Sequence, residues 1–569
     1  SMGEEISQEN GAQRWWLKRD WILYTLLLGF RIVLCPFLPG YVHPDEFFQG
    51  GQELWFGCPP FVPWEFEPEH ALRSVAPPTV MTWMPLQAYA WATGTSMYAL
   101  SGREILVIPR IFCALLSVLT VDLSVWCLTA TFSRERAPTA SVLVVATAWP
   151  TCVLLNRPFT NALETMLLAL LLLCTNTASQ RYRIDLIAGI LCAIALFTRF
   201  TFVFVAFPSM MRYLVNKLSL SLSSALFGIA IIGISFLGTA AAIVYADVLY
   251  YSSDRGDSWA SFVAPLNALL YNSQVENLKE HGLHPRWTHA LVNTMLLFGP
   301  LTVIVYVMLG RRVWSLFRKS TTQCKDETSL TRIRSTCLCT LVSGLCFLSM
   351  APHQEPRFIL PLLVPLAILS EQYYNSTWFK AIWALFNVIL FLLFGVLHQG
   401  GVMPSLISVS DVLSAQTDLP RAVFYYHTYM PPTFASRMRI SHTKPCTAER
   451  ESCNSKCSIE SLSCIINVPI VDLKGSSAES LLVTTEESLS CGSKVESKAK
   501  ERIYLVSPPI RMGDVVIYPN ECFLGTSFSC ERVESHWPHL TTEDFPPLEG
   551  SMRNVLSNFN LGIYEVTCA

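Results

Sequence analysis

The sequence predicts an all-α polytopic membrane protein that ends in a water-facing domain. Of its 569 residues, 51% are hydrophobic and only 15% are charged, whereas about a quarter are charged in soluble domains. Apolar runs of membrane-spanning length alternate with short polar loops up to about residue 400, and no such run follows. The formal net charge of −2 excludes nucleic acid as the partner, because phosphate-backbone binding needs a dense positive surface.

About eleven membrane-spanning helices are expected, and the placement of Lys and Arg orients them. Arg14 and Arg19 precede the first apolar run, so residues 1–19 are expected in the cytosol. The later basic loops are also cytosolic if the run 80–100 lies in the membrane surface without crossing. The expected spans lie near residues 20–38, 107–131, 139–156, 162–177, 184–198, 200–215, 223–250, 289–309, 335–351, 357–370 and 381–398. Several are short for a hydrocarbon core about 30 Å thick, which predicts breaks at Arg199 and Pro361.

On this topology residues 20–400 form the membrane module, with lumenal loops at about 39–106 and 251–288, and residues 401–569 form a lumenal domain. Eight of the nineteen cysteines lie in that domain, namely Cys446, Cys453, Cys457, Cys464, Cys491, Cys522, Cys530 and Cys568. An even number of cysteines in a water-facing domain predicts disulfides in an oxidising compartment. A zinc site formed by Cys453, Cys457 and Cys464 is the alternative, although a paired C-x-x-C is missing.

Polar and ionisable residues that lack an anchoring role gather on the predicted lumenal side. They occupy residues 41–49, 63–66, 73–74, 109–110, 156–164, 198–199 and 352–358. Such residues at a membrane boundary mark functional sites. The sequence therefore predicts a lumenal active site at the membrane face.

Asp45 and Glu46 follow Pro44, a helix-starting residue, so helical spacing turns Asp45 and Gln49 to one face and Glu46 away. Asp45 is the candidate general base that removes a proton from an acceptor hydroxyl. The alternative is that it only caps a helix. Since no second acid stands at a clear glycosidase spacing, we expect group transfer and not hydrolysis.

A leaving phosphate needs positive groups, for which we select His353, Arg357, Arg110 and Arg157. For Arg110 and for Arg199, anchoring at the membrane interface is an equal alternative. Nucleotide-binding, zincin and hydrolase motifs are absent from the sequence, as is a D-x-D pair for a sugar nucleotide and its metal. A lipid-phosphate donor needs neither metal nor cofactor, and we expect none.

Several of these segments resemble the signatures of one enzyme family. They are H-P-D-E-F-F-Q at 43–49, Trp64-Glu65-Phe66, Arg73-Ser74, N-R-P-F-T-N at 156–161 with Glu164, and P-H-Q-E-P-R-F at 352–358. They resemble the dolichyl-phosphate-mannose-dependent mannosyltransferases of glycosyltransferase family 22, in the GT-C superfamily, over about residues 20–400. The H-P-D-E-F-F-Q form and the loop from Asn267 to His289 resemble the branch that adds the fourth mannose in glycosylphosphatidylinositol (GPI) assembly.

The resemblance implies a GT-C fold and an inverting transfer of mannose, in α-1,2 linkage, to the third mannose of a GPI precursor in the endoplasmic reticulum lumen. It implies that Asp45 is catalytic, with Glu46 positioning the loop or the acceptor. Substrate contacts are expected from His43, Gln49, Trp64, Glu65, Asn161, Glu164, Gln354 and Glu355. The expected partners are membrane lipids, the lipid-linked donor and the GPI glycolipid, and we expect a monomer.

Three other functions stay open at this point. One is transfer of the third GPI mannose, or of a mannose to an N-glycan precursor. A lipid or sugar transporter is another, because boundary charges also mark substrate paths. The last is a non-catalytic subunit of a lumenal complex.

Overall fold

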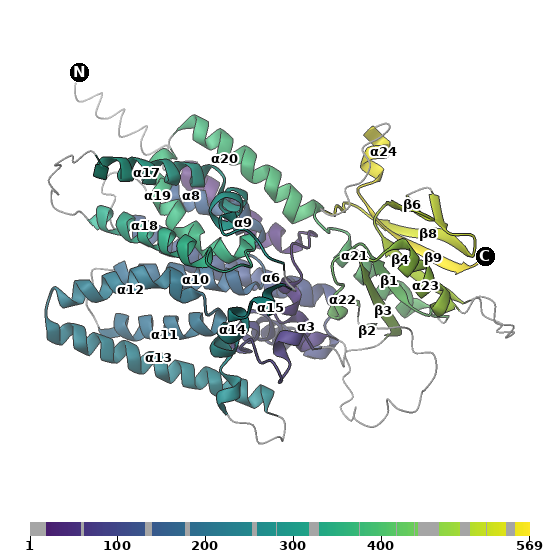
Figure 1. The fold of residues 1–569 in the computed structure, drawn as a ribbon, viewed down its shortest axis with the longest axis horizontal. Coiled ribbons are helices and arrows are strands. Elements are labelled where there is room, and N and C mark those ends of the chain that lie inside the picture. The colour runs from purple at the N-terminus through teal and green to yellow at the C-terminus, as the bar shows by residue number, and fades with distance from the viewer. Residues whose placement is uncertain are drawn as a thin grey trace. The chain divides into compact units, whose positions relative to one another are not determined.

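The computed structural model describes residues 19–57, 62–130, 139–176, 182–252, 259–279, 282–317, 329–374, 376–416, 418–436, 438–441, 466–489, 501–518, 521–541 and 552–569. The chain divides into two compact units (Figure 1). The membrane unit comprises residues 1–36, 64–81 and 110–389, and the C-terminal unit comprises residues 37–63, 82–109 and 390–569. The domain boundaries predicted at residues 19 and 400 are not tested by this division into units, and they stay predictions.

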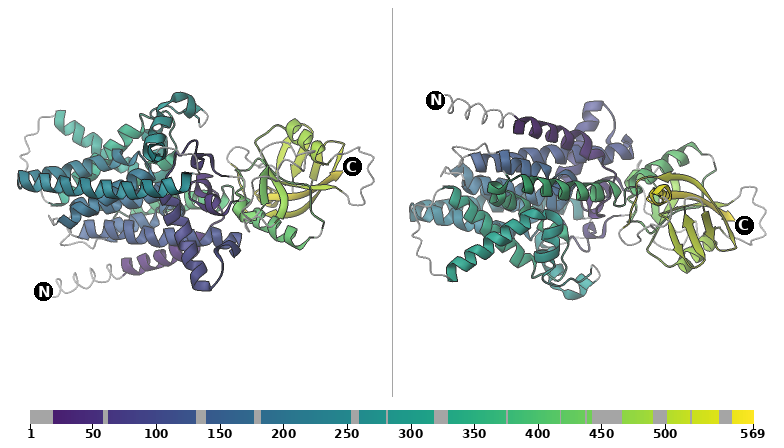
Figure 2. Two further views of the ribbon diagram at one scale, coloured as in Figure 1. Left: turned by 90° about the horizontal axis from the view of Figure 1, so that it is seen from below. Right: turned by 90° about the horizontal axis from the view of Figure 1, so that it is seen from above.

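The membrane unit is built from helices that range from three to thirty residues in length. A first helix covers Arg19–Phe37. The others are α4 (Ala76–Pro78), α6 (Gly102–Ser117), which begins in the C-terminal unit, α7 (Leu123–Ala130), α8 (Thr139–Thr147), α9 (Trp149–Val153), α10 (Thr160–Asn176), α11 (Tyr182–Thr198), α12 (Phe202–Leu218), α13 (Leu222–Tyr251), α14 (Ala264–Ser273), α15 (Val275–Lys279), α16 (Thr294–Phe298), α17 (Pro300–Phe317), α18 (Ser329–Leu348), α19 (Leu363–Ser370) and α20 (Thr377–Leu390). Helices α10 to α13 lie side by side, with α11 against α13 and α12 against α18 (Figures 1 and 2).

Within the described part of the chain, four helices are long and apolar enough to cross a bilayer unbroken: Arg19–Phe37, Gly102–Ala130, Leu222–Tyr251 and Thr377–Leu397. They confirm a membrane protein that crosses the bilayer several times. Helices lie at all of the predicted spans, but several are interrupted, so the count of about eleven crossings stays a prediction. The breaks do fall at the two expected points, because Arg199 separates α11 from α12 and Pro361 lies in the 3₁₀ turn Pro356–Leu362.

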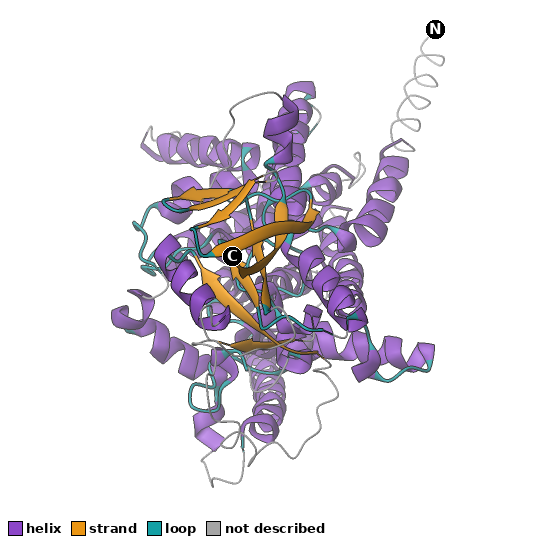
Figure 3. Ribbon diagram, turned by 90° about the vertical axis from the view of Figure 1, so that its right-hand side faces the viewer, coloured by secondary structure: helices purple, strands orange, loops and turns teal. Residues whose placement is uncertain are grey.

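The C-terminal unit contains a β-sheet, so the all-α prediction is wrong for this part of the chain. Its strands are β1 (Val423–Tyr426), β2 (Met438–Ser441), β3 (Ile466–Lys474), β4 (Arg502–Ser507), β5 (Ile510–Met512), β6 (Val515–Tyr518), β7 (Glu521–Leu524), β8 (Phe528–His536) and β9 (Leu561–Cys568). A six-stranded sheet has the order β2-β3-β1-β4-β9-β8, in which β2, β3, β1 and β4 are parallel, and β9 pairs antiparallel with both β4 and β8. Figure 3 shows the strands in orange. Strands β5, β6 and β7 form a second sheet.

Helices α21 (Val402–Ala415) and α23 (Ala478–Leu489) pack on this sheet. Other helices of the unit are α2 (Asp45–Phe48), α3 (Gln52–Phe56), α5 (Met84–Thr93), α22 (Thr433–Ser436) and α24 (Met552–Ser557). Along β1 the side chains alternate: Val423 and Tyr425 join the core that contains α21, whereas Phe424 and Tyr426 join the core that contains α23. A central parallel strand buried on both faces is typical of α/β architecture.

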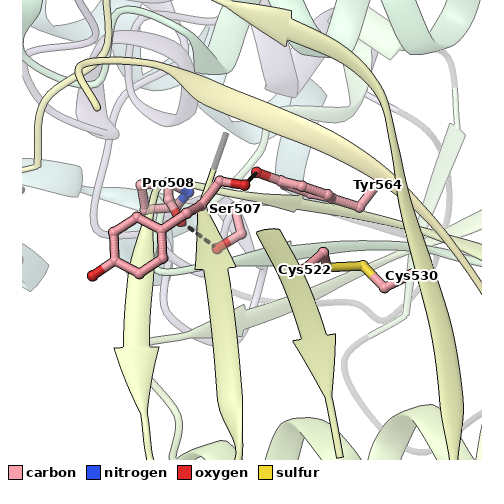
Figure 4. Close-up of a disulfide and its surroundings, with 6 residues drawn as sticks. Ser507, Pro508, Cys522, Cys530 and Tyr564 are labelled. Carbon is pink, nitrogen blue, oxygen red and sulfur yellow. Dashed lines mark hydrogen bonds between the residues drawn. A yellow bond between two sulfur atoms is a disulfide. The ribbon is translucent and has the colours of Figure 1, made fainter. Parts of the chain in front are cut away.

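The predicted disulfides are confirmed at one pair among the described residues, since Cys522 in β7 is bonded to Cys530 in β8 (Figure 4). This bond ties the three-stranded sheet to the edge of the six-stranded sheet. Cys568 is also disulfide-bonded. Cys446, Cys453, Cys457, Cys464 and Cys491, and with them the zinc alternative, lie outside the described residues.

A buried carboxylate in α3 fixes the first loop to a distant part of its unit. Glu53 is only 1% exposed and accepts hydrogen bonds from the Thr433 backbone N–H at 3.1 Å, the Phe434 N–H at 3.3 Å and the Thr433 hydroxyl. It therefore satisfies the free N–H groups at the start of α22. Burial raises the pKa of Glu53 to about 7, although these hydrogen bonds oppose the shift.

We expect Glu53 to make the stability of the C-terminal unit depend on pH. The folded state holds a proton that the unfolded state loses, so stability falls as pH rises from 4.5 to about 7. The full shift corresponds to about 3 kcal/mol. Glu53→Gln keeps an acceptor for Thr433 but cannot ionise, so the thermal midpoint of the purified protein should fall less between pH 5 and 8. The exposed Glu487→Gln is the matched control, and an unchanged slope in Glu53→Gln would contradict this prediction.

Candidate active site

In the C-terminal unit, the predicted base lies at the start of a short helix. Pro44 precedes α2, Asp45 and Glu46 form its first turn, and Gly51 (φ 106°) turns the chain into α3. The Asp45 side chain keeps 19% of its exposure, whereas Glu46 is fully buried. His43 Nδ1 accepts a hydrogen bond from the Asp45 N–H at 3.2 Å and lies 3.5 Å from Asp45 Oδ1. The two acids therefore differ in exposure, and their predicted roles stay predictions.

Two amides close to this acid are buried. Gln49 is 5% exposed and Gln52 is fully buried. The Oε1 atom of Gln49 and both amide atoms of Gln52 have no hydrogen-bond partner among the described residues. Buried polar groups are almost always hydrogen-bonded, so these atoms point to a ligand or ordered water beside α2. Gln52 was not among the residues selected from the sequence.

In the membrane unit, the segment 353–357 is held by its own side chains and by the loop before α16. His353 Nε2 lies 2.8 Å from Glu355 Oε1, and His353 Nδ1 lies 2.9 Å from the Gly282 carbonyl oxygen. The other carboxylate oxygen of Glu355 accepts from Arg357 Nε. Burial acts to lower the pKa of His353, but the hydrogen bonds to Glu355 and Gly282 and the Glu355 charge outweigh it, so the pKa is raised above 6.5.

Gln354, predicted to contact substrate, is 1% exposed. Its Oε1 accepts from the His289 N–H at 2.8 Å, and its Nε2 donates to the Ser349 and Ala351 carbonyls at 3.0 Å. Its amide thus joins α18 to the segment that begins at His289. These contacts fix the position of the neighbouring His353 and Glu355.

A further arginine, Arg199, lies with this segment. Arg199 Nε is 3.4 Å from Glu164 Oε2. The Arg199 guanidinium carbon lies 4.8 Å from the centre of the Phe358 ring, and that of Arg357 lies 5.5 Å from the same centre. One aromatic ring is therefore shared by two guanidinium groups, an arrangement that favours positive charge.

Arg73 is the third guanidinium of this group. Its Nε and one terminal nitrogen contact Glu65 Oε1 at 3.1 and 3.0 Å. Burial is the largest of the effects that lower the pKa of Arg199 to about 10. The positive charges of Arg73 and Arg357 also lower this pKa, whereas the negative charge of Glu164 raises it. We call Arg73, Arg199 and Arg357, with Glu65, Glu164 and Glu355, the arginine cluster.

Not all predicted phosphate-binding residues belong to this cluster. Arg110 is 1% exposed and donates to the Pro36 carbonyl at 3.3 Å. Arg157, also 1% exposed, lies close enough to Cys35 for its charge to act on that thiol. Both therefore lie at the end of the first helix, near the buried pair formed by Arg31 and Asp122 at 2.6 Å.

The remaining predicted substrate contacts lie near the cluster. Asn161 is fully buried and stands one helical turn before Glu164 on α10. Trp64 is 38% exposed and its ring lies 5.5 Å from that of Tyr271 in α14. Among the described residues, no group of three His, Cys, Asp or Glu side chains is arranged to hold a metal ion.

The sequence matches the Alg9-like mannosyltransferase family over residues 21–430. The chain belongs to this family. It is similar to GPI mannosyltransferase 4 of Aspergillus oryzae, with 29% identity over 581 residues that cover 95% of this chain and 98% of the relative. It is also similar to GPI alpha-1,2-mannosyltransferase 4 of Homo sapiens, with 32% identity over 72% of this chain and 75% of the relative.

Among solved structures, the fold is similar to the crystal structure of ArnT from Cupriavidus metallidurans bound to undecaprenyl phosphate. The TM-score is 0.50 at 12% identity, over 87% of this chain and 93% of that chain. This confirms the GT-C fold that the motifs implied. Family membership also confirms that the motif resemblance correctly identified a mannosyltransferase.

The structure gives two arginines contacts that the sequence did not predict. Arg199 was compatible with interfacial anchoring, but in the structure it is paired with Glu164 and shares Phe358 with Arg357. Arg73 was noted as a polar position on the lumenal side and as part of a family signature, but no phosphate-binding role was assigned to it. One feature of the sequence could have indicated the role of Arg199: Glu164, in the preceding helix α10, is an acid that also lies at the boundary of a predicted span.

Proposed function

We propose that this mannosyltransferase transfers mannose from dolichyl-phosphate-mannose to the third mannose of a GPI precursor, in α-1,2 linkage and with inversion. A GPI acceptor is supported by the names of both relatives, one of which aligns with 95% of the chain, and the α-1,2 linkage is supported by the name of the human relative. The reaction takes place at the lumenal face of the endoplasmic reticulum membrane, the side to which the placement of basic residues in the other loops assigns the polar segments. Membrane lipids surround the enzyme, which acts as a monomer.

The arginine cluster is the observation that carries the donor assignment. Three guanidinium groups, each held by a carboxylate, lie close enough for the charges of Arg73 and Arg357 to act on Arg199. Guanidinium groups bind phosphate through permanent charge and several N–H donors. The site therefore suits a donor whose leaving group is a phosphate attached to a lipid.

In the proposed reaction Asp45 takes the proton of the acceptor 2-hydroxyl, whose oxygen attacks C1 of mannose on the face opposite the phosphate. The bond from C1 to the phosphate oxygen breaks, and dolichyl phosphate leaves with the electron pair. His353 and Arg357 stabilise the negative charge that develops there. Because the raised pKa of His353 favours imidazolium, this assistance is lost as pH rises through that pKa. No metal ion or cofactor enters the scheme.

Mannose transfer by the purified protein tests this proposal. We expect transfer from dolichyl-phosphate-mannose to a three-mannose GPI acceptor, unchanged by a chelator, with a product that an α-1,2-specific mannosidase degrades. Preference for a two-mannose acceptor would instead assign the third mannose. Transfer to neither acceptor would overturn the GPI assignment, and an N-glycan precursor as acceptor and lipid transport are then the functions to assay.

A further inference from the structure

The end of α13 holds the chain segment that carries Arg73. Tyr251 donates its hydroxyl proton to the Arg73 carbonyl oxygen at 2.6 Å. Asp247 Oδ1 accepts from the Ser74 hydroxyl and from the Val75 N–H, each at 2.9 Å. Asp247 and Tyr251 are four residues apart, so both lie on one face of the helix. Three consecutive residues, 73 to 75, are thus bound to two side chains of α13.

Both side chains are committed to this contact. Asp247 is fully buried and Tyr251 is 1% exposed, and the Tyr251 ring stacks on Phe262 with a centroid distance of 5.7 Å and an angle of 7°. The Asn267 amide adds a hydrogen bond to the Ala71 carbonyl at 3.1 Å. A buried carboxylate is costly unless it is hydrogen-bonded, and residues 74 and 75 supply hydrogen bonds to Asp247.

The segment held in this way leads into the arginine cluster. Directly after it, α4 packs against both α11 and α13, and Arg199 is the first residue after α11. The charge of Arg73 acts on both Arg199 and Glu164. A shift of the 73–75 backbone would therefore move one of the three guanidinium groups relative to the other two.

We propose that Asp247 and Tyr251 are positioning residues, which hold the backbone of residues 73–75 so that the Arg73 guanidinium contacts the phosphate of the lipid-linked donor. The inference rests on the proposed function for the identity of that donor. Glu65 is compatible with this role, because its Oε1 engages two of the five N–H donors of Arg73. Neither Asp247 nor Tyr251 needs to touch substrate.

Conservative variants separate positioning from general stability. Tyr251→Phe removes only the hydroxyl that contacts Arg73, and Asp247→Ala removes the acceptor for Ser74 and Val75, whereas Asp247→Asn keeps an acceptor oxygen. We expect the KM for the donor to rise about fivefold in Tyr251→Phe, the effect of one ordinary hydrogen bond. Asp247→Ala should raise it about tenfold or more, since two hydrogen bonds are lost, and Asp247→Asn should recover most of the loss. The KM for the acceptor should change less than twofold.

Tyr245→Phe is the matched control, because Tyr245 is on the same helix but 65% exposed, and it should behave as the wild type. A double-mutant cycle supplies the second test. If Tyr251 acts through Arg73, Tyr251→Phe has no further effect on the donor KM in an Arg73→Gln background. Equal effects with and without Arg73, or a donor KM within twofold of wild type in both Tyr251→Phe and Asp247→Ala, would overturn the inference.

Binding of dolichyl phosphate alone, followed as thermal stabilisation, distinguishes this inference from the proposed function. If the wild type transfers no mannose but binds dolichyl phosphate, and Tyr251→Phe and Asp247→Ala weaken that binding about fivefold or more, the proposed function fails and the positioning role stands. If transfer proceeds and both variants bind dolichyl phosphate as the wild type does, the positioning role fails and the function stands.

Discussion

Replacing Asp45 by Asn is expected to lower kcat for mannose transfer by about 10²- to 10⁴-fold, the usual contribution of a general base. The amide keeps the size and the helix-capping ability of the side chain but cannot accept the proton of the acceptor hydroxyl. The partial exposure of Asp45, beside a fully buried Glu46, is what makes this carboxylate available to a substrate. Initial rates at saturating donor and acceptor measure the effect.

Two comparisons make this result specific. Glu69→Gln changes an exposed acid of the same loop and should leave the rate unchanged, while thermal midpoints establish that the Asp45 variant is folded. Glu46→Gln should lower the thermal midpoint, because that side chain is buried, and it should lower kcat less than Asp45→Asn does. If Asp45→Asn retained a rate within about tenfold of the wild type, Asp45 would only form part of the first turn of α2 and would not be the base.

The helices of the membrane unit could be predicted from the sequence because an apolar run of span length has few alternative structures. The breaks at Arg199 and Pro361 could be predicted for the related reason that a charge or a proline interrupts such a run. By contrast, the run Val423–Tyr426 has only four residues, and a short apolar run without polar alternation does not distinguish a buried strand from a helix. The sheet of the C-terminal unit was missed on this account.

The site residues divide in the same way. His43, Asp45, His353 and Arg357 could be selected as candidates because each stands in a short polar segment next to apolar runs. Long-range pairs carry no such signal: Glu53 binds residues 380 positions away. The coordinates were also needed to find Phe358 shared between two arginines, because a ring beside a guanidinium is ordinary in sequence. Such contacts depend on how helices pack, which local patterns do not specify.

Replacing Arg357 by Gln is expected to lower kcat/KM for the donor by about 10²- to 10³-fold, the effect of removing one group that stabilises charge in a transition state. The change removes a permanent charge from the cluster, and it leaves the Glu355 carboxylate without the guanidinium that it contacts. The unpaired carboxylate would then repel the leaving phosphate. Arg357→Lys should recover only part of the loss, because a single ammonium group does not reproduce the planar donors of a guanidinium.

The role of Glu355 provides an internal test of this reasoning. In an Arg357→Gln background, Glu355→Gln removes the unpaired negative charge and should restore part of the donor kcat/KM, although alone it should reduce it. Arg103→Gln, which changes an exposed arginine, is the control for loss of positive charge as such. If Arg357→Gln acted equally on donor and acceptor kinetics while the control was neutral, Arg357 would support the fold of the segment 353–358 and not the departure of the phosphate.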